Sequence, residues 1–306
     1  MAATSVILIL NPASGSGVHQ PAIRQAAWAR QIDVREVRAG YRADALARDA
    51  VNEGAQVLVA AGGDGTVSAV AGVAVGHDVP LVVVPCGRRN HFAKDCGADI
   101  TDPAGELAAI EDGHEIRGDV GMVNGRVFLD NVSVGFYAAM VRDPDYRRRR
   151  IRVAARYVQR ALLGRGRRAS LRTPVPRRVV TPEQVLVTLV SNNAYFPGVA
   201  PGQALRPRLD EGMLWVYLLG LPGAHRPLPA RLLRGTGRLM SGRALVAAWP
   251  TTQQTMTTDT PSIPVGIDGE PAELNTPLEF TACPRALRLL QPSRNESVDQ
   301  QFSLHW

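Results

Sequence analysis

The feature that most constrains the fold is an apolar run, Val57 to Ala61, that leads into Gly62-Gly63-Asp64-Gly65-Thr66 and then into a helical pattern. A short apolar run bounded by glycines is typical of a buried strand. Glycines let the backbone approach a ligand closely, and the free N–H groups of a first helical turn favour an anion. The pattern predicts a phosphate-binding turn, with a plain tight turn as the alternative. Neither the Walker nor the Gly-x-Gly-x-x-Gly pattern is present, which disfavours an ordinary P-loop or Rossmann dinucleotide site.

Strands and helices alternate along the first third of the chain. Strands are predicted at residues 5–10, 33–38, 56–61 and 81–84, and helices at 21–30, 42–52 and 66–75. This alternation predicts a parallel sheet that is covered on both faces.

The pattern changes after about Glu115. Residues 116–129 are predicted to form a hairpin centred on Asn124-Gly125, a pair that favours a type I′ turn. Further strands are predicted at 185–190, 214–219, 245–249, 263–267, 278–282 and 286–290, with one helix at 146–163. We therefore expect an α/β domain at 1–125, an antiparallel β-sandwich at 126–292 and a polar C-terminal tail at 293–306.

Four short blocks follow one another along the chain: Asn11-Pro12-Ala13-Ser14-Gly15, Gly62-Gly63-Asp64-Gly65-Thr66, Pro85-Cys86-Gly87-Arg88-Arg89-Asn90-His91-Phe92-Ala93 and Val265-Gly266-Ile267-Asp268-Gly269-Glu270. In this order they resemble the diacylglycerol kinase catalytic-domain family of lipid kinases. Weaker similarities occur at 131–136, 192–195 and 209–214. The resemblance implies an N-terminal α/β nucleotide-binding domain joined to a C-terminal β-sandwich, with the active site in the cleft between them.

The resemblance also implies roles for individual residues. The residues expected to line the ATP phosphates are Asn11, Ser14, Gly15, Gly62, Gly63, Gly65, Thr66 and Asn90. Asp64 would face a catalytic Mg²⁺ or its waters. Glu270 would take the proton from a lipid hydroxyl, and Asp268 would orient Glu270 or the metal. Without the family context, Asp268-Gly269-Glu270 is better interpreted as a hairpin turn with solvated acids.

Three residues depart from the family pattern. Arg88 stands where a threonine hydroxyl would contact the nucleotide, and its guanidinium could bind phosphate directly or fill the pocket. His91 replaces the commoner aspartate after Asn90 and is interpreted as a structural residue rather than a base or ligand. Glu211 replaces an aspartate at the position of a structural Mg²⁺, where a longer side chain demands different geometry.

The positive charge is concentrated in one segment. Between Arg142 and Arg178 there are 14 arginines and 2 acids, a local charge of +12, whereas the rest of the chain has 21 bases and 26 acids, a net −5. One face of the predicted helix carries an arginine every four residues, at Arg148, Arg152, Arg156 and Arg160. Three interpretations of this stripe compete: a face that is simply exposed to solvent, a surface that binds anionic membrane, and a patch that binds nucleic acid. Tyr157 is the only aromatic residue between Arg147 and Arg178, which disfavours nucleic acid.

The N-terminus has no basic region before its short apolar run and the chain has no apolar stretch near 18 residues, which predicts a cytoplasmic protein. Three cysteines without Cys-x-x-Cys spacing argue against a disulfide framework or a zinc site. We expect an ATP- and Mg²⁺-dependent kinase that phosphorylates diacylglycerol or a related lipid while peripherally bound to an anionic membrane. The alternatives are a small-molecule kinase similar to NAD kinase and a catalytically silent lipid- or anion-binding protein.

Overall fold

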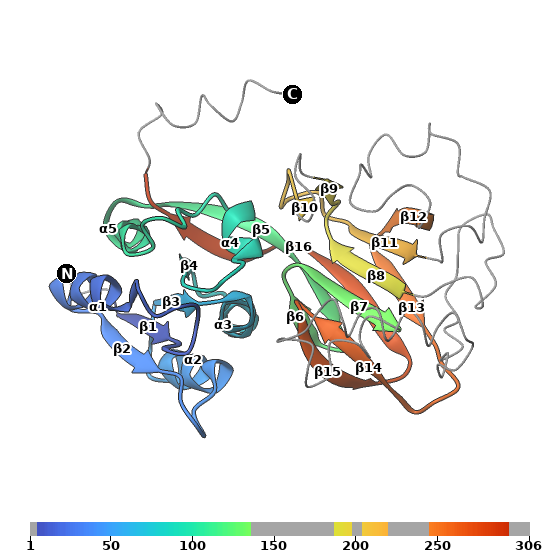
Figure 1. Cartoon of the computed structure of the whole chain (residues 1–306), viewed down its shortest axis with the longest axis horizontal. Coiled ribbons are helices and arrows are strands. Elements are labelled where there is room, and N and C mark those ends of the chain that lie inside the picture. The colour runs from blue at the N-terminus through green and yellow to red at the C-terminus, as the bar shows by residue number, and fades with distance from the viewer. Residues whose placement is uncertain (1–4, 136–186, 198–203, 220–244, 294–306) are drawn as a thin grey trace. The chain divides into compact units, whose positions relative to one another are not determined.

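The structure, a computed structural model, describes residues 5–135, 187–197, 204–219 and 245–293 (Figure 1). The chain forms two compact units: unit 1 comprises residues 1–118 and 286–306, and unit 2 comprises residues 119–285. The chain therefore passes between the units twice, within β5 (His114–Val123) and within β16 (Leu278–Gln291). The predicted helix at 146–163, with its arginine stripe, lies outside the described residues.

Unit 1 is an α/β unit with a parallel sheet in the order β2-β1-β3-β4, as the alternating pattern predicts. The last part of β16 pairs in parallel with β4, through Leu289 and Leu81. The strands are β1 (Val6–Leu10), β2 (Asp33–Glu36), β3 (Val57–Gly62) and β4 (Leu81–Pro85). The helices are α1 (Gln20–Ala29), α2 (Ala43–Asn52), α3 (Asp64–His77), α4 (His91–Asp95), the 3-10 helix η1 (Gly105–Ala108) and α5 (Ala109–Asp112).

Helices cover both faces of this sheet. Every residue of β3 is buried, which requires cover on both sides because successive side chains point to opposite faces. On one face, Val59 and neighbouring strand residues pack against Ile23 and Ala27 of α1. Helices α2 and α3 contact β1 and β3, where Leu58 and Ala60 are also fully buried. The all-apolar sequence of β3 is thus explained by its central place in the sheet.

Unit 2 is an antiparallel β-sandwich, as expected. One layer is a sheet in the order β12-β11-β8-β7-β14-β15. Its strands are β7 (Asn131–Gly135), β8 (Val187–Asn192), β11 (Leu214–Leu219), β12 (Leu245–Thr251), β14 (Ser262–Ile267) and β15 (Glu270–Asn275). The other layer contains β6 (Arg126–Phe128), β13 (Gln253–Met256) and the unit 2 parts of β5 and β16. A separate short pair joins β9 (Phe196–Pro197) and β10 (Ala204–Leu205).

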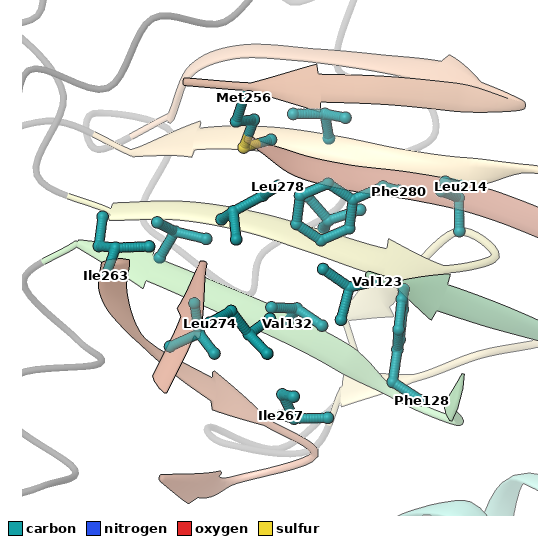
Figure 2. Packing of buried hydrophobic residues seen from close by; sticks show 14 of the residues in the cluster. Val123, Phe128, Val132, Leu214, Met256, Ile263, Ile267, Leu274, Leu278 and Phe280 are labelled. Carbon is teal, nitrogen blue, oxygen red and sulfur yellow. The ribbon is translucent and has the colours of Figure 1, made fainter. Parts of the chain in front are cut away.

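The core of unit 2 lies between the two layers (Figure 2). Phe128 and Phe280, from β6 and β16, meet edge to face with their ring centroids 6.5 Å apart. Val132 and Ile267, from β7 and β14, come from the facing layer. Residues far apart in the sequence therefore share one apolar interior, as a sandwich requires.

Two sequence predictions can be compared directly with the strands. The hairpin at Asn124-Gly125 is confirmed, because both residues have positive φ and Val123 pairs with Arg126 across the turn. The two strands predicted at 278–282 and 286–290 are instead one strand, β16. The interruption expected between them is only a local irregularity at Arg285, where φ is 53°.

The division into units also differs from the expected boundaries at 125 and 292. The second crossing of the chain lies at residue 285, so the last strand segment returns to unit 1. Its pairing with β4 explains this return, because β4 would otherwise present an unpaired edge.

Candidate functional site

Three loops of unit 1 follow the carboxyl ends of neighbouring parallel strands. They are residues 11–17 after β1, residues 62–66 at the end of β3, and residues 86–90 after β4. In parallel α/β sheets, ligands bind at this edge. The Asn11 amide donates to the Thr66 hydroxyl at 2.9 Å, and the Gly63 N–H donates to the Ser14 hydroxyl at 3.1 Å. The structure thus brings the first two sequence blocks together, and we call the three loops the cradle.

The cradle is built by close contact between backbones. Gly15 has a φ of 63°, and a Cβ there would lie 2.2 Å from the Cys86 carbonyl oxygen. A Cβ on Gly87 would lie 2.5 Å from the Gly63 Cα. Only glycine fits at these points, since real Cβ atoms do not approach other atoms so closely. Gly15 and Gly87 therefore allow the loops to touch.

Asn90 fixes the third loop. Its backbone is left-handed, with φ at 53°, and its side-chain amide bonds both the N–H and the carbonyl of Gly87, at 2.8 and 3.0 Å. The Asn90 side chain is therefore engaged with the loop itself. Its expected contact with a nucleotide stays a prediction.

Asp64 links the starts of two helices. It is the first residue of α3, and its Oδ1 accepts the N–H of His91, the first residue of α4, at 2.6 Å. Burial lowers the pKa of His91, with the Asp64 charge acting in the opposite direction. This burial favours the uncharged imidazole, and the cationic side chains of the loop, Arg88 and Arg89, are exposed.

Within the described ranges, no group of three or more His, Cys, Asp or Glu side chains is placed to hold a metal ion. Mg²⁺ in phosphate sites commonly uses one or two carboxylates, with substrate phosphates and waters completing the shell. Asp64, at the start of α3 and beside the glycine turn, fits that pattern. Glu211, expected at a structural Mg²⁺, accepts the Ala194 N–H at 3.1 Å, and its metal role stays a prediction.

In unit 2, Asp268 and Gly269 form the two-residue turn between β14 and β15. Both have positive φ, and Ile267 pairs with Glu270 across the turn. Asp268 is not a solvated turn acid, because its carboxylate accepts three consecutive backbone N–H groups, from Leu129 at 2.9 Å, Asp130 at 2.8 Å and Asn131 at 3.0 Å. Glu270, the first residue of β15, is exposed.

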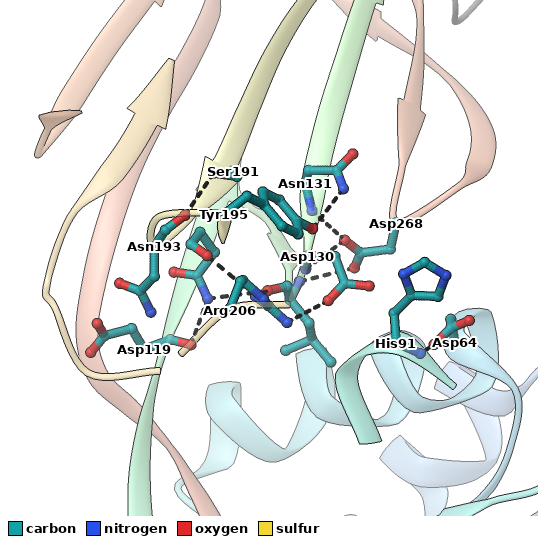
Figure 3. Close-up of polar contacts among 12 residues, drawn as sticks. Asp64, His91, Asp119, Asp130, Asn131, Ser191, Asn193, Tyr195, Arg206 and Asp268 are labelled. Carbon is teal, nitrogen blue, oxygen red and sulfur yellow. Dashed lines mark hydrogen bonds and ion pairs between the residues drawn. The ribbon is translucent and has the colours of Figure 1, made fainter. Parts of the chain in front are cut away.

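The same 129–131 segment supplies one member of a buried ion pair, Asp130 with Arg206, that the sequence did not predict (Figure 3). The Arg206 guanidinium is fully buried and donates to the Asp130 carboxylate at 2.5 Å. It also donates to the carbonyl oxygens of Leu129 and Asn192. Arg206 and Asp130 are 76 residues apart and match no motif, so no sequence signal connects them.

A second buried acid, Asp119, was also missed. Its carboxylate accepts the N–H of Arg285 at 2.8 Å and the N–H of Gly212 at 2.6 Å. Asp119 of β5 therefore binds both the irregular residue of β16, Arg285, and the loop before β11. The Asp119 carboxylate thus binds backbone N–H groups, as Asp268 does, whereas the Asp130 carboxylate binds Arg206.

Comparison with known proteins relates the part of the chain that contains the cradle to a family model. Residues 5–123, which contain all three cradle loops, match the sequence model described as "Diacylglycerol kinase catalytic domain". This part of the chain is therefore similar to that catalytic domain. The resemblance stated above is thereby confirmed.

Curated relatives and a solved structure match nearly the whole length of the chain. A protein of Mycobacterium tuberculosis named "Diacylglycerol kinase" is 29% identical over 301 residues, covering 94% of this chain and 95% of the relative. A Pseudomonas aeruginosa protein named "Probable lipid kinase YegS-like" is 28% identical over 308 residues, covering 94% of each chain. The crystal structure of a Bacillus anthracis diacylglycerol kinase has a TM-score of 0.62 at 16% identity, covering 94% of this chain and 97% of that one. This likeness confirms the two-part fold.

The relatives are named kinases, so the kinase class expected from the sequence is supported. No helix in the described parts of the chain is long and apolar enough to cross a membrane.

Proposed function

We propose that this protein is a lipid kinase of the diacylglycerol kinase family, and that it transfers the γ-phosphoryl group of ATP to a hydroxyl of diacylglycerol or a related lipid. The observation that supports this proposal most is the cradle. Three glycine-containing loops meet at the carboxyl edge of a parallel sheet, beside the start of α3. The N–H groups of a first helical turn and nearby glycine backbone favour phosphate oxygens.

On the nucleotide side, the loops at Asn11 to Gly15 and Gly62 to Thr66 would hold the phosphates. Mg²⁺, when bound, would neutralise charge on the phosphate oxygens, and Asp64 is the residue that would hold it. Arg88 would add a guanidinium to the same group of contacts, in place of the hydroxyl usual in the family. The Asn11 and Ser14 side chains bond the second loop, so contacts of the protein itself hold these two loops together.

On the acceptor side, Glu270 would take the proton from the lipid hydroxyl as that oxygen attacks the γ-phosphorus. Glu270 is exposed and lies at the end of a two-residue turn. Asp268, two residues earlier, would fix the turn rather than exchange protons, because three N–H groups bind its carboxylate. Such a reaction depends mainly on positioning and on charge neutralisation.

The test uses purified full-length protein with labelled ATP and mixed micelles of diacylglycerol, with a sphingoid base and NAD as separate acceptors. We expect label in the lipid and a fall of about 100-fold in kcat for Glu270→Gln, as for loss of a general base. The matched control is Glu273→Gln, an exposed glutamate on the same strand, which should leave kcat unchanged.

Each rival predicts a different result. Label in NAD alone would favour a kinase similar to NAD kinase. Binding of ATP without turnover on any acceptor would favour the silent binding protein, with Arg88 filling the pocket. Full activity in Glu270→Gln would remove Glu270 from the mechanism.

We also propose that the arginine-rich segment, including Arg148 and Arg160, brings the enzyme to anionic membrane. Each basic residue near an anionic leaflet contributes on the order of 1 kcal/mol. Liposome sedimentation should show binding that requires anionic lipid and falls when the four stripe arginines are reversed to glutamate. Equal binding to neutral vesicles would contradict this.

A further inference from the structure

A buried arginine in unit 2 contacts the segment that holds the proposed catalytic turn. The Arg206 side chain is 0% exposed and that of Asp130 is 8% exposed. Burying two charges costs free energy, and apolar residues of similar volume often replace such pairs without loss of stability. A buried pair is therefore weak evidence for stability, and its contacts must be examined for another role.

Arg206 and Asp268 bind opposite chemical groups of the same short segment. Arg206 donates to the Leu129 carbonyl and to the Asp130 carboxylate. Asp268 accepts the N–H groups of both residues and of Asn131. The segment from Leu129 to Asn131 thus connects a buried guanidinium to the turn between β14 and β15.

Other contacts limit how this segment can move. The Asn192 amide donates to the Leu129 carbonyl at 3.1 Å, and the Asn192 N–H donates to the Asp130 carbonyl at 3.0 Å. The Arg206 guanidinium also lies over the Tyr195 ring, 5.8 Å from its centroid, and the Tyr195 hydroxyl accepts the Asn131 amide at 3.0 Å. Arg206 is at the centre of these contacts, and only Gly269 separates Asp268 from Glu270.

We propose that Arg206 is a positioning residue for Glu270. Arg206 binds the segment from Leu129 to Asn131. The N–H groups of this segment bind the Asp268 carboxylate, and Asp268 fixes the turn on which Glu270 lies. This inference rests on the proposed function, because it assumes that Glu270 is the base. It gives Arg206, which contacts neither the lipid nor the nucleotide, the role of fixing the position of Glu270, the group that contacts the lipid hydroxyl.

The test compares Arg206→Met with Arg208→Met in the full-length protein. Arg208 is two residues away and forms an exposed pair with Asp210 at 3.0 Å, so it is a matched control. For Arg206→Met we expect kcat per folded molecule to fall about 100-fold, as for a displaced catalytic group, with KM for ATP within about twofold of wild type. Arg208→Met should match wild type in both constants. A kcat for Arg206→Met within about twofold of wild type would overturn the proposal.

The double variant Arg206→Met, Asp130→Leu separates positioning from stability. It removes both charges, so no buried charge is left unpaired, and its folding stability should recover toward wild type. The proposal expects kcat to stay low in this stable variant. Recovery of kcat together with stability would show a purely structural role and would overturn it. Arg206→Lys keeps the charge without the planar fork and should recover only part of the lost kcat.

Hydrogen exchange gives a readout that does not depend on activity. The amides of Leu129, Asp130 and Asn131 should exchange at least about tenfold faster in Arg206→Met and in the double variant, and at the wild-type rate in Arg208→Met. Unchanged exchange in Arg206→Met would also overturn the proposal. If wild type itself phosphorylates no acceptor, the proposed function fails, whereas normal turnover by Arg206→Met defeats the positioning role alone.

Discussion

The polar sites of the two units are formed by different chemical groups, mainly backbone in unit 1 and charged side chains in unit 2. In unit 1, the cradle is made mostly of backbone, with glycines that allow the loops to touch and small polar side chains that join them. In unit 2, the end of the sandwich that carries Asp268 depends on carboxylates: buried Asp119 and half-buried Asp268 bind N–H groups, and buried Asp130 binds Arg206. A site that binds a charged ligand benefits from available backbone dipoles, whereas a site that presents a single carboxylate needs rigid support around it.

If close backbone contact defines the cradle, adding one methyl group should damage it severely. Gly15→Ala should lower stability by about 4 kcal/mol, because it combines a steric clash with a positive φ that disfavours a Cβ. Nucleotide affinity should fall by at least ~100-fold. Thermal unfolding and titration with a fluorescent ATP analogue measure the two effects.

Gly17→Ala is the matched control for this substitution. Gly17 lies in the same loop and also has a positive φ, at 77°, but its nearest neighbour would be 3.4 Å from the new Cβ. It should cost only about 1 kcal/mol, the cost of the backbone conformation. Equal losses in the two variants would mean that backbone conformation, and not contact between loops, governs the cradle.

If carboxylates that bind backbone N–H groups stabilise unit 2, removing the charge of one of them at constant side-chain shape should lower the free energy of unfolding. The loss should be smaller than that expected for Gly15→Ala. Asp268→Asn should lower the free energy of unfolding by about 2 kcal/mol, since three N–H groups lose an ionised acceptor and one faces an amide donor. Urea denaturation measures this. Asp210→Asn, at an exposed acid paired with Arg208, should be within about 0.5 kcal/mol of wild type.

The smallest effect is expected at an exposed pair in unit 1. Arg288 donates to both Glu115 oxygens, at 2.9 and 2.6 Å, and this hydrogen bonding lowers the pKa of Glu115. A carboxyl with a lowered pKa stabilises the folded state above its unfolded pKa, and that contribution is lost as pH falls through the folded value. Glu115→Gln should therefore cost about 0.5 kcal/mol at pH 7 and nothing near pH 3.

Salt provides the contrast between the two kinds of ion pair. Added NaCl should reduce the effect of Glu115→Gln, because exposed charges are screened. The Arg206 and Asp130 pair is buried and should respond little to the same salt. Equal salt dependence for the two pairs would contradict the burial seen in unit 2.

The same difference explains what the sequence could predict. The strands and helices of unit 1 and the block Gly62 to Thr66 are readable because each signal is local: an apolar run, then glycines, then a helix start. The turn at Asn124-Gly125 is readable for the same reason. Asp268 and Glu270 could be named only through a family resemblance, because Asp-Gly-Glu alone indicates a turn, which it also is.

The remaining features depend on contacts between distant residues. Arg206 meets Asp130, and Asp119 meets Arg285, only after the sandwich has folded. The continuity of β16 through Pro284 and Arg285 was missed because a proline beside an irregular residue resembles a break between strands. Periodicity gives the elements but not these pairings, since it contains no information on which distant segments meet.

The return of the chain to unit 1 has a consequence for synthesis on the ribosome. Residues 1–118 emerge first, but β4 receives its partner Leu289 only after all of unit 2 has been made. The nascent unit 1 would therefore wait with an open sheet edge, which is a template for pairing with other chains. A chain that stalls or is cut after residue 285 would keep its cradle sequence and still lack the strand that pairs with β4.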